Sequence, residues 1–172
     1  MKFKKTVLTS KGKDLMTYAL NGYGLQFTRM VLSSQNIRDE ELENLSTLSE
    51  QMSETVQAIE RFDNDTVILK STYTNEFLDY NFYVSAIGIY AKTDVTSEIL
   101  FGVALTYPDN KDYMPSKYEK EFTMYVDMFL SMGNAEIVIK EDIVEKQRQE
   151  KYIESLMDRS VETINFPNDL KS

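Results

Sequence analysis

The side chains of this chain that could do chemistry are carboxylates and tyrosines, because the sequence contains no His and no Cys. Their absence excludes an imidazole base, a thiolate nucleophile and a zinc site of the usual His or Cys type. A pair of Asp or Glu side chains at a set separation, as in glycoside hydrolysis, is the catalytic arrangement left open. No such pair can be assembled from the sequence. We therefore assign no catalytic, cofactor-binding or metal-ligating residue, expect no cofactor, and predict a protein that is not an enzyme.

Carboxylates are densest in residues 38–60, an acidic insertion with seven Asp or Glu side chains against one Arg. Leu42, Leu45 and Leu48 recur there at three-residue steps, which predicts a thin helical stripe. The segment lacks the spacing of Asp, Asn and Gly that a calcium-binding loop requires. We expect a solvated face, with an electrostatic contact to a neighbouring subunit as the alternative. Asp63-Asn64-Asp65 resembles the start of a calcium-binding loop, but the required Gly and distal Glu do not follow, so these residues predict a turn.

Tyrosine is the other abundant type, with eleven residues, and several lie in or beside the proline-containing loop 108–120. Exposed aromatic rings stack on the apolar faces of sugars. They also provide protein interfaces with contact area at low entropic cost. Because the chain has no Trp, we favour a protein interface over a glycan site. The interface residues predicted in this region are Tyr107, Tyr113, Met114 and Tyr118.

The formal net charge of −9 on 172 residues disfavours nucleic acid and anionic lipid as partners, since both are held by Lys and Arg. No apolar run approaches the roughly 20 residues of a membrane span, and the N-terminal apolar patch is too short for a signal sequence. We expect a soluble protein that is synthesised in the cytoplasm of its host.

The elements that must position these side chains are mostly strands. Residues 82–91 and 99–107 are two apolar runs, each with one glycine, and predict an antiparallel hairpin of core strands. Residues 122–130 alternate cleanly and predict a second hairpin with 135–140. Further strands are predicted at 25–32, 57–60 and 66–73, and a helix capped by Ser10 at 11–20. We predict an α+β fold with an antiparallel β-sandwich-like core and a short N-terminal helix.

The C-terminal segment follows a different pattern. Apolar side chains recur at helical spacing after residue 150, which predicts a helix that buries one stripe against its own domain or against another chain. We predict a C-terminal assembly helix, with the domain at 1–143 and this helix and tail at 144–172. The interface residues predicted on the helix are Tyr152, Ile153, Leu156, Met157 and Val161.

Short motifs in the same order resemble the N-terminal domain of phage tail-collar fibre proteins, over about residues 3–143. They are Leu8-Thr9-Ser10-Lys11-Gly12, Leu25-Gln26-Phe27-Thr28-Arg29-Met30, Phe82-Tyr83, Ile87-Gly88-Ile89-Tyr90-Ala91, Ile99-Leu100-Phe101-Gly102-Val103-Ala104, Asp112-Tyr113-Met114-Pro115 and Gly133-Asn134-Ala135. The chain differs from that family by Ala86, where an acidic residue is usual, and by ending at Ser172 instead of continuing into a fibre.

The resemblance implies a structural virion protein that attaches fibres or receptor-binding proteins to the baseplate of a bacteriophage or a phage-tail-like particle. It also implies assembly as a homotrimer with other baseplate or tail-fibre proteins as partners. We expect a stand-alone adaptor, located in the tail of the virion, with a short helix in place of the fibre shaft. The alternative function is a receptor-binding module of the tail for host-wall carbohydrate.

Overall fold

The computed structural model describes residues 3–132 and Met157. The chain divides into two compact units, Met1–Lys140 and Glu141–Ser172. The boundary that the sequence predicts after residue 143 lies outside the described residues. The predicted strand 135–140 lies outside the described residues. So does the predicted C-terminal helix, apart from Met157, which has helical backbone conformation.

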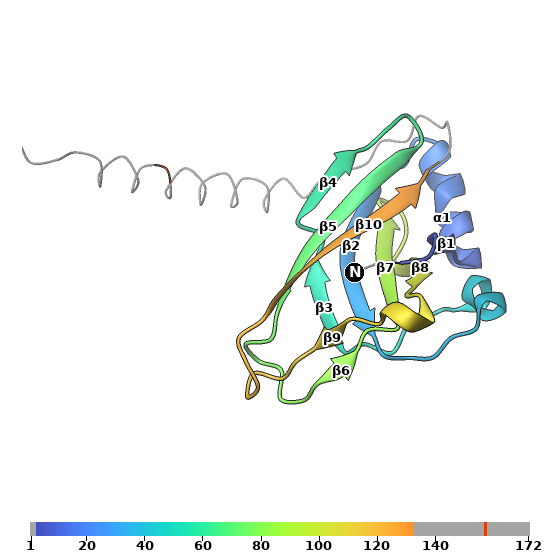
Figure 1. Ribbon diagram of the computed structural model, residues 1–172. Helices are drawn as coiled ribbons and strands as arrows, with labels where there is room; N and C mark the ends of the chain where they lie inside the picture. The colour runs from blue at the N-terminus through green and yellow to red at the C-terminus, as the bar shows by residue number, and fades with distance from the viewer. Residues whose placement is uncertain (1–2, 133–156, 158–172) are drawn as a thin grey trace, which may run out of the picture. The chain divides into compact units, whose positions relative to one another are not determined.

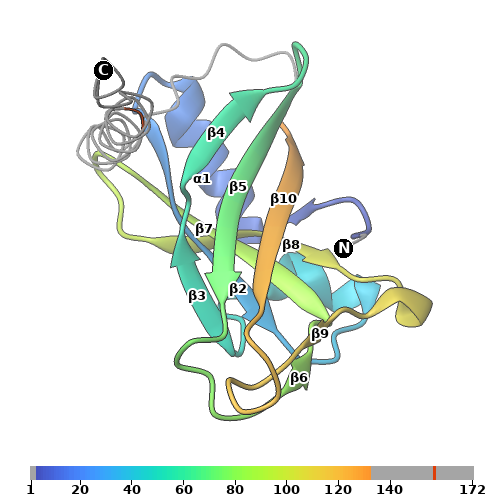
Figure 2. The same cartoon turned by 60° about the vertical axis from the view of Figure 1, so that its left-hand side comes forward.

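The first unit is built from antiparallel sheets, which confirms the predicted α+β, sandwich-like class (Figure 1). The larger sheet has five strands in the order β1 (Val7–Leu8), β8 (Ile99–Leu105), β7 (Ala86–Thr93), β2 (Leu25–Ser33) and β3 (Met52–Thr55). The smaller sheet has the order β10 (Thr123–Ser131), β5 (Thr66–Thr74) and β4 (Ala58–Arg61). A ladder of two residues per strand joins β6 (Phe82–Tyr83) to β9 (Tyr113–Met114). Figure 2 shows the smaller sheet crossing one face of the larger.

The main core lies between the two sheets. Alternate residues of β10 point inward and are buried, as the sequence predicts: Met124, Val126, Met128 and Leu130. They belong to the same buried cluster as Met30 and Ile89 of the larger sheet. Tyr73 of β5 is fully buried there, and its hydroxyl donates a hydrogen bond of 2.8 Å to the carbonyl of Met30. This bond ties the two sheets together and satisfies a buried polar group.

Helix α1 (Ser10–Leu20) is capped by Thr9, so the prediction of Ser10 as the cap is wrong. The hydroxyl of Thr9 accepts a hydrogen bond of 2.9 Å from the amide of Gly12 and also donates to the carbonyl of Leu100 in β8. Thr9 therefore anchors the start of the helix to the sheet. Gly12 allows that close approach, because a Cβ atom at this position would lie 1.9 Å from the carbonyl oxygen of Phe101.

We predict that Gly12→Ala destabilises the protein by about 3 kcal/mol, since the added methyl group meets backbone atoms that cannot move aside independently. Denaturant unfolding of the full chain measures the change. Lys11→Ala, at an exposed position of the same helix, is the control and changes stability by less than about 0.5 kcal/mol. Equal stability of the two variants contradicts the tight contact between α1 and β8.

The second face of the larger sheet is covered by the acidic insertion, not by solvent. Leu42 and Leu48 are buried in a cluster with Val31, Tyr90 and Val103. The insertion forms a 3₁₀ helix, η1 (Asp39–Asn44), followed by irregular backbone and then β3 and β4. The predicted helix over 38–60 is therefore wrong, because Leu42 and Leu48 lie on a 3₁₀ helix and on irregular backbone, whereas most carboxylates of the segment are exposed to solvent, as predicted: Asp39, Glu40, Glu43 and Glu50. We call residues 38–50 the acidic strap.

Side chains of the sheet and of the N-terminal region hold the carboxylates of the acidic strap. Lys4 pairs with Asp39 at 3.0 Å and Lys13 with Glu43 at 3.1 Å. Arg29 of β2 pairs with Glu50, and its guanidinium lies 4.0 Å from the ring centroid of Tyr90. Ion pairs this exposed stabilise little, so the leucines supply most of the free energy that holds the strap.

We predict that Leu48→Ala lowers the free energy of unfolding by about 2–5 kcal/mol, because a side chain that packs over Gly88 is lost. Leu20→Ala, at an exposed leucine of α1, is the control and changes it by less than about 0.5 kcal/mol. Chemical denaturation monitored by tyrosine fluorescence compares the two. A solvated strap would make both substitutions equally harmless.

The two glycines of the central hairpin serve packing within the chain. A Cβ atom on Gly88 would lie 3.0 Å from side-chain atoms of Leu48 and Leu100. One on Gly102 would lie 3.1 Å from Thr6 and 3.2 Å from the carbonyl oxygen of Val7. The acidic strap and the N-terminal strand therefore come as close to these strands as their backbones allow.

Candidate functional site

Two of the predicted loop tyrosines, Tyr113 and Tyr118, lie in residues 113–120. This segment meets the loop 75–83 at one end of the first unit, beside β6 and β9 (Figures 1 and 2). The predicted core strand 82–91 is wrong in one respect, since it is interrupted at Val84 and Ser85. Its first part, β6, pairs with β9 and not with β8. We call residues 75–83 and 113–120 the tyrosine tip.

The short β6–β9 ladder determines which side chains of the tyrosine tip are exposed. Phe82 pairs with Met114, and both side chains are buried in the core. Tyr83 pairs with Tyr113 on the opposite face, with ring centroids 5.2 Å apart. The prediction of Met114 as an interface residue is therefore wrong, because alternation along β9 turns it inward.

Asn75 holds the two loops of the tyrosine tip together. It is buried, and its side-chain amide donates to the carbonyls of Pro115, Ser116 and Lys120 at 3.1, 3.1 and 2.7 Å. Its side-chain oxygen accepts from the amide of Phe122 at 2.9 Å. One side chain thus satisfies four backbone groups and fixes the second loop against the first.

A polar network lies beside the exposed Tyr83–Tyr113 pair. The hydroxyl of Tyr113 donates to Oε1 of Glu119 at 2.6 Å, and the amide of Asn81 donates to the same oxygen at 2.9 Å. The hydrogen bond to Glu119 is the main reason why the pKa of Tyr113 is raised. Both bonds engage Oε1, so Oε2 takes part in neither of them.

Tyr118 lies on the same loops and is 75% exposed. Its hydroxyl donates to Asp79 at 3.1 Å, and Lys117 forms an ion pair with Asp79 at 2.6 Å. The bonds from Lys117 and then Tyr118 lower the pKa of Asp79. The ring of Tyr118 is thus held in place, with Nζ of Lys117 over one face at 5.0 Å from the ring centroid, while most of the side chain stays exposed. Three further exposed rings of the tip were not predicted from the sequence: Phe77, Tyr80 and Tyr83.

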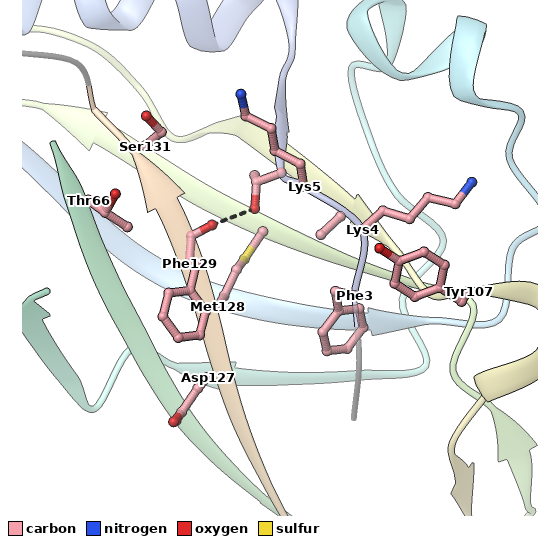
Figure 3. Close-up of a pocket in the computed structure, with 11 residues that line it drawn as sticks. Phe3, Lys4, Lys5, Thr66, Tyr107, Asp127, Met128, Phe129 and Ser131 are labelled. Atoms are coloured by element: carbon pink, nitrogen blue, oxygen red, sulfur yellow. Dashed lines mark hydrogen bonds between the residues drawn. The ribbon is translucent and has the colours of Figure 1, made fainter.

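Tyr107 lies apart from the other predicted tyrosines, in the wall of a groove of about 570 Å³ between the N-terminal segment and β10. Figure 3 shows the rings of Phe3 and Tyr107 on one side of this groove and Met128 and Phe129 on the other. The hydroxyl of Thr6 donates to the carbonyl of Phe129 at 2.9 Å, which holds the N-terminal segment to β10.

Aromatic side chains also lie on the outer face of the smaller sheet, where the sequence predicted no site. Phe62 and Phe129 meet edge to face, with centroids 5.5 Å apart, and both are more than half exposed. Tyr125 stands on the same outward-facing side of β10 and is 75% exposed. We call Phe62, Tyr125 and Phe129 the sheet patch. The sequence alternation that predicts the buried side chains of β10 also identifies the side chains of this strand that point outward.

The remaining predictions concern chemistry and the C-terminus. Within residues 3–132 and 157, no three His, Cys, Asp or Glu side chains gather where they could hold a metal ion. None of the helices in that part of the chain has the length and apolar character that a membrane crossing requires. The side chain of Met157 is exposed. The other predicted helix residues lie outside the described part of the chain: Tyr152, Ile153, Leu156 and Val161.

Comparisons of the chain with protein-family models, with curated proteins and with solved structures found no match. The resemblance to tail-collar fibre domains therefore stays a prediction from the motifs. The fold and the exposed side chains define a β-rich domain with two exposed aromatic surfaces, the tyrosine tip and the sheet patch.

We predict that Asn75→Ala destabilises the protein by about 3 kcal/mol, because the substitution removes the side-chain partner of the carbonyls of Pro115 and Lys120 and of the amide of Phe122. Hydrogen exchange checks the cause, since the amides of residues 115–122 should exchange faster. Asn81→Ala, at an exposed asparagine of the same tip, is the control and costs less than about 1 kcal/mol. Unchanged exchange in residues 115–122 would show that Asn75 is not the link between the loops.

Proposed function

We propose that this protein is a structural virion protein, an adaptor that attaches fibres or receptor-binding proteins to the baseplate of a phage or phage-tail-like particle. It acts by offering surfaces to other tail subunits. The observation that carries the proposal is the sheet patch, three large aromatic side chains at least half exposed on the outer face of a regular sheet. Exposed apolar groups that gather in this way mark contact surfaces for other proteins.

The sheet patch is suited to a partner because the sheet beneath it is rigid. Phe129 is paired across the sheet with Ile68 of β5, and Tyr125 with Thr72. The inward residues of the same strand are buried, so the outward rings are held in fixed positions at little entropic cost. The groove that contains Tyr107 is continuous with the patch, since Phe129 contributes to both.

The motifs behind the resemblance support the same class. Most of them form the scaffold: Gly12 packs on Phe101, and Gly88 and Gly102 pack under the acidic strap and the N-terminal strand. Such residues preserve a fold and do no chemistry. A domain of that kind serves as an attachment module, for which the resemblance implies a homotrimer with baseplate or tail-fibre proteins as partners.

The test is incorporation of variants into particles assembled from the genome that encodes this chain. We predict that Phe62→Ser combined with Phe129→Ser reduces incorporation about 30-fold, the equivalent of losing about 2 kcal/mol at an aromatic contact. Quantitative mass spectrometry of purified particles, relative to another tail protein, gives the measurement. Thermal unfolding confirms that the variant folds.

The matched control is Tyr18→Ser combined with Tyr23→Ser, which removes another exposed aromatic pair, with ring centroids 6.2 Å apart, at the end of α1. This variant should be incorporated normally. Normal incorporation of the sheet-patch variant would contradict the contact surface. A monomeric mass by light scattering, together with absence of the protein from purified particles, would contradict the adaptor role itself.

A further inference from the structure

The tyrosine tip differs from the sheet patch in its polar groups. At the sheet patch, Phe62 and Phe129 contact each other. At the tip, the ring of Tyr83 lies beside the ring of Tyr113, whose hydroxyl donates a hydrogen bond to Glu119. The hydroxyl of Tyr118 donates a hydrogen bond to Asp79. Two exposed rings of the tip, Tyr83 and Tyr118, thus lie close to a carboxylate whose position is fixed by hydrogen bonds.

We propose that the tyrosine tip binds a neutral saccharide. A pyranose ring has an apolar C–H face and a rim of hydroxyl groups, and it needs a flat aromatic surface next to planar hydrogen-bonding groups. Tyr83 and Tyr118 provide the aromatic surfaces, and Glu119 and Asn81 the planar groups. Oε2 of Glu119 is suited to accept a sugar hydroxyl, because Oε1 already accepts from Tyr113 and Asn81.

The same polar groups make a protein partner less suitable at the tip. A protein that covered these loops would remove the carboxylate of Glu119 from water, which costs free energy unless a new partner matches it, whereas Asp79 is already paired with Lys117. Saccharide hydroxyls replace the lost water molecules one for one while the rings stack. An acidic saccharide is disfavoured, because the three acidic side chains on these loops outnumber the two basic ones: Glu76, Asp79 and Glu119 against Lys117 and Lys120.

The tip is also organised before any ligand binds. Asn75 fixes the two loops through four hydrogen bonds, and the β6–β9 ladder sets the direction of Tyr83 and Tyr113. A small ligand therefore does not have to order these loops, which reduces the entropic cost of binding. Saccharide binding goes beyond the adaptor function and does not depend on it.

The experiment applies the full chain to an array of neutral and acidic oligosaccharides and then titrates the best neutral one by calorimetry. We expect binding to neutral members and weakening of about tenfold or more for Tyr83→Ala and for Tyr118→Ala. Tyr83→Phe should bind like the unsubstituted protein, because it keeps the ring. Glu119→Gln should weaken binding, because it replaces a charged acceptor by a neutral one.

Tyr125→Ala is the matched control, since Tyr125 is as exposed as Tyr118 but lies on the sheet patch. It should leave saccharide binding unchanged. The proposal is overturned if no neutral oligosaccharide binds, if only acidic ones bind, or if Tyr125→Ala weakens binding as much as Tyr118→Ala. A cross-link from the tip to another tail protein in purified particles would likewise overturn it. Failure of the adaptor function has a separate readout, the incorporation of the sheet-patch variant.

Discussion

The structure depends on the burial of the central hairpin, β7 and β8, on both faces. Nearly every residue of these strands is buried, including Ile87, Tyr90, Phe101 and Val103. A sheet that is apolar on both sides needs a cover on each side. The smaller sheet and α1 cover one face, and the acidic strap covers the other. The acidic insertion is therefore structural, and its negative charge lies outside while its leucines face inward.

Packing against the hairpin buries one side of each surrounding element and leaves the other side exposed. In β10 the inward side is occupied by Met and Val, so the outward side presents Tyr125 and Phe129. In the β6–β9 ladder, Phe82 and Met114 are buried and Tyr83 and Tyr113 point outward. Both candidate surfaces follow from the two-residue period of strands that pack on the core.

The sequence predicted the elements whose periodicity is long and unambiguous. β10 and the β7–β8 hairpin were found because alternation or continuous apolar character extends over most of each strand. The acidic strap was misjudged, since leucines at three-residue steps fit a helix as well as an irregular segment lying on a sheet. No sequence pattern predicts the role of Asn75, because its four hydrogen-bond partners lie about 40 residues further along the chain. Met114 was misplaced because a two-residue strand is too short to show a period.

The two aromatic surfaces differ in the charged side chains that lie beside their exposed rings, and this difference favours a different kind of partner at each surface. At the sheet patch, Lys70 of β5 forms an ion pair with Glu60 of β4 at 2.9 Å, and Asp127 is the register neighbour of Lys70 on β10. Such a pair tolerates a protein partner, because neither charge is left alone when water is removed. At the tyrosine tip, the carboxylate of Glu119 is held by two neutral donors, the hydroxyl of Tyr113 and the amide of Asn81. Removing water from it is costly, whereas hydroxyl groups can solvate it. The proposed adaptor can therefore bind a protein partner through the sheet patch and leave the tip accessible to the proposed saccharide.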